Sequence, residues 1–434
     1  MPCMIVNAQI FALVLFLSDD FLAVFMPFMA VMVDGTQYFG NWGEILNYLP
    51  WAIPPVIAVI FHFAVYRKPI RFGMSGRGIC AVSLAVLLSG FSVVSLSDMA
   101  DVEAIYHYAM FSLGAFLLYV IFYSNLSTKK RHDIYEHFIW CLFYVGFACF
   151  VIVFDCLTDF LLSENADRMD SYFELIYARN SVAPLLIMAL PAPFYFAKKK
   201  GRAYTRIFAF LIGLMFYAAL LLTGARTAFL FGTLFFVICL FYFCYGKEGF
   251  WVKLICMGIF AAAAWIAWRR FGASIVDLIE YRLTDGRLVS PDEARVKLLF
   301  RSVEDLYRAP LFGIGIASTA NVDLYGEMPG CIVWYHLYFP QIWGSMGFVG
   351  LVAYLYQGIV RLRLSLYRPI VKTAAIALSY LGLFFYSQTD PGEFVPIPFG
   401  IMAILMFALL DHHYEANSLP TAPERRDWLL FPWK

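Results

Sequence analysis

The chain has 434 residues, of which 62% are hydrophobic and 15% are charged, and its net charge is +1. Soluble globular proteins contain about 45–50% apolar and about 25% charged residues, so this composition excludes an ordinary soluble globule. The apolar residues form long, near-continuous runs, which excludes the short alternating segments of an outer-membrane barrel. The composition therefore predicts an all-α, polytopic membrane protein.

Twelve apolar runs are candidate transmembrane helices, since a span needs about 20 residues. Their ranges are 8–33, 47–66, 79–96, 105–123, 138–157, 181–197, 207–222, 227–245, 254–268, 336–360, 373–388 and 397–411. Ser18, Asp19 and Asp20 interrupt the first run, which predicts either one broken helix or two short ones.

The positions of the positively charged residues orient this map, because Lys and Arg stay on the cytoplasmic side of a membrane. Of the 32 Lys and Arg residues, 21 fall on one side of the map, including Arg361 after the tenth run. The alternate loops 34–46, 97–104 and 389–396 contain acidic residues and no Lys or Arg. We therefore expect both termini to be cytoplasmic.

The other eleven Lys and Arg residues fall on the outer side, and eight of them lie in the long segment 269–335. Long translocated loops escape the charge rule, which accounts for part of this excess. Arg226 is different, because only a short turn separates its two flanking runs. A guanidinium held at the membrane surface suits a phosphate ligand, although it could instead reach lipid headgroups.

The outer segment contains one predicted helix, at about 291–308. Ser290 fits the N-cap, Pro291 the first helical position and Glu293 a capping box. Apolar residues at helical spacing form one stripe, which we expect to face the membrane domain: Val296, Leu299, Phe300, Val303, Leu306 and Tyr307. Arg295 lies on the flank of this stripe, whereas Lys297, Arg301 and Arg308 are predicted on the opposite face.

His336 lies among interfacial aromatic residues at the start of the tenth run, and Pro340 fits the first turn of that helix. An imidazole there could accept a proton near neutral pH, or it could simply bond the backbone. The outer acidic residues form no tight pair typical of a divalent-metal site, so we favour a metal-free mechanism. The nine cysteines show no zinc or disulfide spacing.

Four blocks between residues 175 and 360 occur in an order that resembles the bacterial O-antigen ligase and polymerase superfamily. The blocks are Arg179–Pro184 with Asn180, Thr223–Arg226, Glu293–Arg295 followed by Ala309–Gly315, and His336 followed by Gly344, Gly347 and Gly350. Family members often have a glycine before the loop arginine and a tryptophan four residues after it. This chain has Ala294 and Leu299 at those positions, whereas Arg287 has the preceding glycine at a different distance from Pro310.

The resemblance implies a GT-C-like helical fold in the bacterial cytoplasmic membrane, with the outer loop 269–335 between nine spans in 1–268 and three spans in 336–411, and a cytoplasmic tail 412–434. It implies inverting glycosyl transfer from a polyprenyl-diphosphate-linked glycan to a glycan, lipid or protein acceptor, without a cofactor or nucleic acid. His336 would be catalytic.

The diphosphate would be bound by Arg226 together with Arg295 or Arg287, of which Arg295 is favoured by spacing. Arg179, Asn180 and Asp390 are candidate supporting residues. Ligation and polymerisation use the same donor, so both remain open. The alternative function is a transporter or flippase, which should place charged groups near mid-membrane, where these runs have few.

Overall fold

The computed structural model describes residues 71–96, 110–126, 133–162, 179–199, 201–244, 291–316, 335–390, 392–394 and 399–418, with the isolated residues 258, 262, 265 and 269. All regular secondary structure in these ranges is helical. The predicted spans 8–33 and 47–66, and nearly all of 254–268, lie outside the described residues. Three described helices are long and apolar enough to cross a membrane: Ile134–Thr158, Ala203–Leu222 and Tyr338–Leu366.

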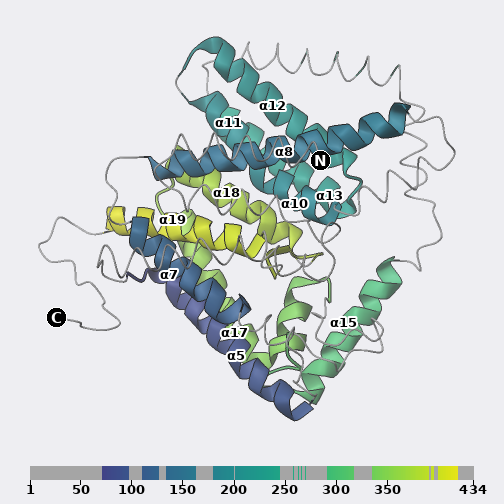
Figure 1. The fold of residues 1–434 in the computed structure, drawn as a ribbon, viewed down its shortest axis with the longest axis vertical. Coiled ribbons are helices and arrows are strands. Elements are labelled where there is room, and N and C mark those ends of the chain that lie inside the picture. Colours follow the sequence, from purple (N-terminus) through teal and green to yellow (C-terminus); the bar gives the residue numbers. More distant parts are fainter. Residues whose placement is uncertain are drawn as a thin grey trace, which may run out of the picture. The chain divides into compact units, whose positions relative to one another are not determined.

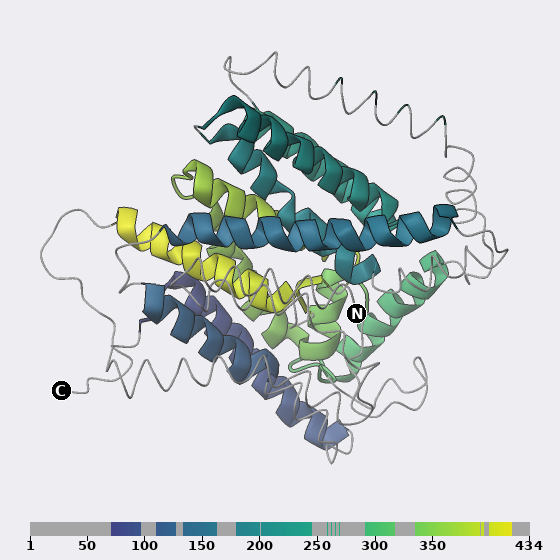
Figure 2. The ribbon, with the colours of Figure 1, turned by 45° about the horizontal axis from the view of Figure 1, so that its top comes forward.

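The described residues form two compact units (Figures 1 and 2). Unit 1 holds the described parts of 138–291 and of 374–386, and unit 2 holds those of 71–137, 292–373 and 387–418. The boundary falls in the first turn of α8 (Ile134–Leu162) and in the first turn of α18 (Val371–Tyr386), and the remaining residues of both helices belong to unit 1.

Unit 1 is a helical bundle built from the middle of the chain. Its helices are most of α8 (Ile134–Leu162), α10 (Arg179–Ala189), α11 (Pro191–Lys198), α12 (Ala203–Leu222), α13 (Arg226–Cys244) and most of α18 (Val371–Tyr386). Aromatic rings fill the contacts between them, as where Tyr217 of α12 stacks on Phe236 of α13 with centroids 3.9 Å apart. The bundle therefore buries its apolar residues mainly against its own helices.

The chain path places two predicted arginines at one end of this bundle. The α10–α11 pair is one bent helix, because Leu190 N–H still donates to Leu186 O (2.9 Å) while Pro191 has no N–H to donate. Helix α12 returns along α11, as Figure 1 shows, and α13 runs forward again after a turn at Gly224 (φ 66°). Arg179 and Arg226, the first residues of α10 and α13, therefore begin at the same end.

Unit 2 joins helices from both halves of the chain. They are α5 (Met74–Leu96), the π-helical turn η2 (Met110–Gly114), α7 (Ala115–Leu126), α15 (Pro291–Arg308, from its second residue), α17 (Tyr338–Leu366), the 3₁₀ turn η5 (Gly392–Phe394) and α19 (Ile401–Ser418). Helix α5 packs antiparallel to α17, because Ser89 Oγ donates to Ser345 O (2.7 Å) whereas Gly78 meets Gln357. Figures 1 and 2 both show α7 beside α5.

One end of unit 2 gathers residues that the charge map places in the cytoplasm, and we call it the cationic end. Arg71 N–H donates to Ser124 Oγ (2.8 Å), Arg363 to the Tyr414 hydroxyl (3.1 Å), and Lys372 is paired with Asp133. Asp411 caps the start of α5 by accepting hydrogen bonds from the N–H groups of residues 74 and 75. The other end holds α15 and the start of α17, and we call it the α15 end.

Helix α17 is broken at Gly347, which has non-helical angles (φ 61°, ψ −156°). The rings of Tyr338 and Tyr354 lie 6.3 Å apart, although sixteen residues of straight helix would separate them by about 24 Å. The arm before the break is therefore bent sharply toward the arm after it. The prediction of one continuous span over 336–360 is wrong, and only the arm Phe348–Leu366, about 28 Å long, has the reach to cross a bilayer.

The loop that follows α15 is bonded to this break through the backbone. Phe348 N–H donates to Pro310 O (2.9 Å), and Ile314 N–H donates to Gly344 O (3.1 Å). The approach is so close that a Cβ on Gly313 would lie 2.3 Å from the Ser345 carbonyl carbon. The Pro- and Gly-rich segment that follows α15 thus fixes α15 to the fold of α17.

Candidate functional site

Helix α15 has the limits predicted from the sequence, Pro291–Arg308, but it docks through a different face. Over residues 296–308 its buried residues are Leu298, Ser302 and Asp305, whereas Phe300 and Tyr307 of the predicted stripe are 66% and 83% exposed. The prediction that the apolar stripe faces the bundle is therefore wrong for these residues. Polar groups on α15 find hydrogen-bond partners at the α15 end, which offsets the cost of burying them.

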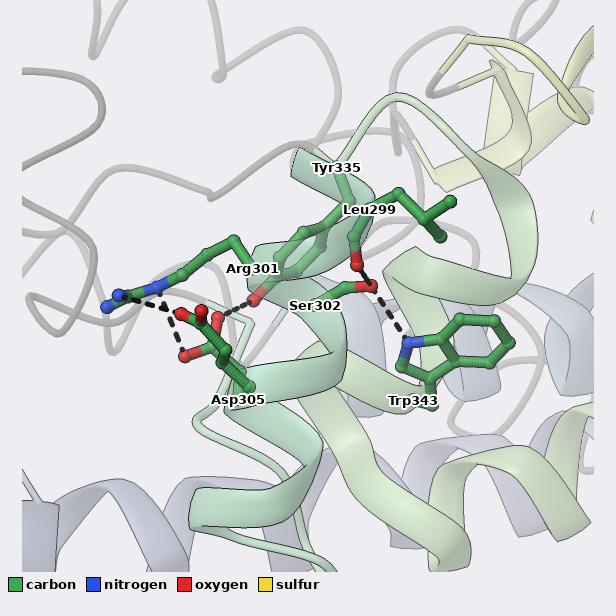
Figure 3. Close-up of polar contacts among 7 residues, drawn as sticks. Leu299, Arg301, Ser302, Asp305, Tyr335 and Trp343 are labelled. Atoms are coloured by element: carbon green, nitrogen blue, oxygen red, sulfur yellow. Dashed lines mark hydrogen bonds and ion pairs between the residues drawn. The ribbon is translucent and has the colours of Figure 1, made fainter. Parts of the chain in front are cut away.

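The central contact joins α15 to the residue that precedes His336. The hydroxyl of Tyr335, a fully buried residue, donates to Asp305 Oδ2 (2.7 Å), as Figure 3 shows. Arg301 Nε lies 3.4 Å from the other oxygen of Asp305. Arg301 does lie on the face opposite the apolar stripe, as predicted, but that side of α15 docks, so Arg301 lies beside the buried carboxylate.

A second contact lies one turn earlier on α15. Trp343 Nε1–H donates to Ser302 Oγ (2.9 Å), and Ser302 Oγ–H donates to the Leu299 carbonyl (2.7 Å), so the serine satisfies both groups (Figure 3). The O–H of the buried Tyr335 and the N–H of the partly buried Trp343 both need polar partners, and α15 supplies them. The helix and the first arm of α17 are thus joined by specific polar contacts.

His336 itself lies half-buried immediately before α17, with a backbone φ of 53°. Residues other than glycine seldom adopt this left-handed conformation, and it is typical of constrained functional positions. Tyr335 N–H donates to Gln341 Oε1 (2.9 Å) across the histidine. Pro340 lies in the first turn of α17, as expected from its sequence position.

A second buried carboxylate bonds the first residue of α17. Glu393 accepts a hydrogen bond from the Tyr338 hydroxyl (2.7 Å) on Oε1 and pairs with Arg361 Nη1 (2.8 Å) through Oε2. Glu393 and Arg361 were predicted on opposite sides of the membrane, in the outer loop 389–396 and the cytoplasmic loop. That prediction is wrong for this pair, because both side chains are buried together inside unit 2.

The other predicted site residues divide between the two units. Arg295 lies on α15 about 15 Å along the helix before Asp305, and Asp390 is buried in the segment that precedes η5. Arg179, Asn180 and Arg226 belong to unit 1, whereas His336 belongs to unit 2. Arg287 lies outside the described residues.

Sequence reasoning did not identify Asp305, Tyr335, Glu393 or Arg361 as parts of a site. It treated polar residues on α15 as solvent-facing and Arg361 as a loop cation. A usable signal existed in Trp343 and Tyr335, whose N–H and O–H groups need acceptors wherever these aromatic side chains are buried.

Among the described residues, no group of three or more His, Cys, Asp or Glu side chains is placed to hold a metal ion. The chain matches no protein-family model, and a comparison with curated protein sequences found no significant match.

Proposed function

We propose that this protein is a multi-pass membrane glycosyltransferase of the O-antigen ligase and polymerase type. It would transfer or polymerise glycan from a polyprenyl-diphosphate donor on the outer face of the bacterial cytoplasmic membrane. About twelve spans and two cytoplasmic termini belong to this proposal. His336 would deprotonate or orient the acceptor hydroxyl, and arginines would neutralise the diphosphate leaving group.

The observation that carries the proposal is the setting of His336. It lies in a strained left-handed conformation at the α15 end of unit 2, between two residues whose side chains bond buried carboxylates. The cationic end of the same unit holds the residues predicted in the cytoplasm. The bond from Tyr335 to Asp305 ties the histidine to α15, the helix of the long segment that the charge map places outside, and this supports a histidine that a lipid-linked glycan would reach from the outer leaflet.

Helices α10 and α13 begin at the same end of unit 1, and their first residues are Arg179 and Arg226. This arrangement supports the role of arginines in binding the donor. Substituting Arg226 or Arg295 by Ala should weaken donor binding and turnover together. Lys should rescue either position poorly, because a point charge does not reproduce the planar guanidinium fork. Titration of purified protein with lipid-linked donor measures both effects.

Arg308 provides the matched control for the arginine substitutions, because it is exposed on α15. Arg308→Ala should leave donor binding unchanged. Arg301→Ala does not serve as a second control, since Arg301 pairs with the buried Asp305. An Arg308→Ala variant as weak as Arg295→Ala would remove the case for a specific arginine on this helix.

Transfer by the purified protein should continue in EDTA. The sequence shows no paired carboxylates in the outer loops and a surplus of arginines there, and fixed guanidinium groups can stabilise a leaving diphosphate. The rate is measured with lipid-linked donor before and after chelation. Loss of activity that manganese or magnesium restores would contradict the proposal that arginines alone serve the leaving group.

Profiles of lipid-linked glycans in a strain that lacks the gene test the function itself. Loss of long chains with repeat units retained indicates a polymerase, and accumulation of long lipid-linked chains indicates a ligase. The same strain complemented with His336→Asn separates loss of chemistry from loss of the protein. An unchanged glycan profile would refute the glycosyltransferase proposal.

A transporter or flippase is the second candidate, and the buried Arg361–Glu393 pair favours it. Ionisable residues inside membrane bundles often mark substrate or ion pathways. Both oxygens of Glu393 are already engaged, by Arg361 and by Tyr338, which is more typical of a structural pair. An unchanged glycan profile together with loss of lipid-linked donor translocation in vesicles would favour this candidate.

A further inference from the structure

His336 lies between two tyrosines that share one arrangement. Tyr335 precedes it and Tyr338 follows two residues later, and each donates its hydroxyl to a buried carboxylate at 2.7 Å. Each carboxylate is in turn paired with an arginine. We propose that these two Tyr–carboxylate–Arg clamps are positioning devices that hold His336 in its left-handed conformation, an inference that rests on the proposed catalytic role of this histidine.

The first clamp connects His336 to α15. Asp305 is 1% exposed, receives the Tyr335 hydroxyl on Oδ2 and faces Arg301 Nε through Oδ1 at 3.4 Å. Arg301 also lies 3.5 Å from Glu304, which leaves it oriented along the helix surface (Figure 3). Through this clamp, the docking of α15 determines the position of the backbone just before His336.

The second clamp connects His336 to the long arm of α17 and to the segment after α18. Arg361 is 7% exposed, and its guanidinium carbon lies 4.8 Å from the centre of the Phe407 ring. Glu393 is held further by its own N–H, which donates to Ser387 Oγ (2.9 Å). Glu393 and Arg361 are therefore held in place by contacts other than the one with Tyr338. The second clamp thus fixes the backbone that follows His336.

Gln341 links the two sides of the histidine. Its Oε1 accepts from Tyr335 N–H, and its own N–H donates to Leu337 O at 2.9 Å. A strained backbone conformation persists only where its surroundings over-determine it, and here three independent contacts do so. In acid–base catalysis, a displacement of about 1 Å can cost about 10²-fold in rate, so such fixation has a catalytic purpose.

The test uses full-length protein in detergent with Tyr335→Phe, Tyr338→Phe and the double variant. Each substitution removes one hydroxyl and keeps the ring. Tyr356→Phe is the control, because Tyr356 is an exposed tyrosine on the same helix. The measurements are kcat and KM for lipid-linked donor, and the rate at which diethyl pyrocarbonate modifies His336, followed by peptide mass spectrometry with His412 as the internal reference.

The double variant should lower kcat by about 10- to 100-fold with little change in the KM for donor, since the imidazole is displaced and the donor site is not. Modification of His336 should accelerate by about three- to tenfold in each single variant, the shift in a local equilibrium expected from loss of one hydrogen bond, and by more in the double variant, while His412 and the Tyr356→Phe control stay unchanged.

A double variant in which His336 reacts at the wild-type rate would overturn the clamp proposal, whatever happens to turnover. The proposed function fails separately. If wild-type protein transfers no glycan and yet the modification rate of His336 responds to the tyrosine substitutions, the clamps stand and the glycosyltransferase proposal does not.

Discussion

Replacing His336 by alanine should lower turnover by about 10²- to 10⁴-fold, the usual contribution of a positioned general base, while binding of the lipid-linked donor persists. The imidazole is the group that would take the proton of the acceptor hydroxyl, and the donor would be held by arginines instead. Single-turnover kinetics with saturating donor measure the chemical step, and donor titration measures binding.

The backbone of His336 requires a second variant, because alanine at φ 53° is strained whatever the side chain does. Asparagine tolerates the left-handed conformation and removes the imidazole, so His336→Asn should fold normally and be as inactive as His336→Ala. If His336→Asn retains full turnover, the histidine serves only to bond the backbone. A pH profile of the wild type should in addition show activity lost as the imidazole becomes protonated.

Gly347→Ala should destabilise the protein by about 3–6 kcal/mol, the largest structural effect that we expect from a single methyl group. Its backbone angles are essentially restricted to glycine, which costs any other residue about 1–3 kcal/mol. A Cβ there would also lie 2.6 Å from Pro310 O and 2.7 Å from Gly313 N. Moving the segment after α15 to relieve these clashes would break its backbone hydrogen bonds to α17, which contribute about 0.5–1.5 kcal/mol each.

Gly358→Ala is the matched control on the same helix. No atom lies within 4 Å of a Cβ at Gly358, and a glycine in a helix interior is disfavoured by about 1 kcal/mol relative to alanine. The control should therefore leave stability unchanged or raise it slightly. Thermal unfolding of both variants in detergent, followed by monodispersity on gel filtration, gives the comparison. Equal melting temperatures would mean that the break in α17 does not depend on Gly347.

Much of the helical organisation in the described residues follows from local properties of the chain. The ranges of α12 and α13 match the runs 207–222 and 227–245 closely, because the position of a long apolar run between polar residues is a local property of the sequence. The start of α15 follows from Pro291 and the acids of its first turn, which also act locally. Such signals need no knowledge of what packs against the helix.

The face through which α15 docks depends on residues far along the chain. Ser302 and Asp305 look like solvent-facing positions because their sequence neighbours are charged, and their burial follows only from Trp343 and Tyr335. Glu393 and Arg361 are separated by 32 residues and were assigned to opposite sides by loop charge alone. The positive-inside rule counts Lys and Arg residues loop by loop, and it does not consider that an arginine can be buried in an ion pair with a carboxylate from another loop.

The sequence by itself determined that the described part of the chain is helical, with apolar helices long enough to cross a membrane. It also determined where α15 begins and ends, and that His336 directly precedes the α17 segment. These outcomes depend on hydrophobic periodicity and caps, which act within a few residues. Only the tertiary structure decided that α17 bends sharply at Gly347, that α15 docks through a polar face, and that His336 lies between two tyrosines whose hydroxyls bond buried carboxylates. The reason is physical: each depends on backbone approach or on charge pairing between segments that lie distant in the sequence.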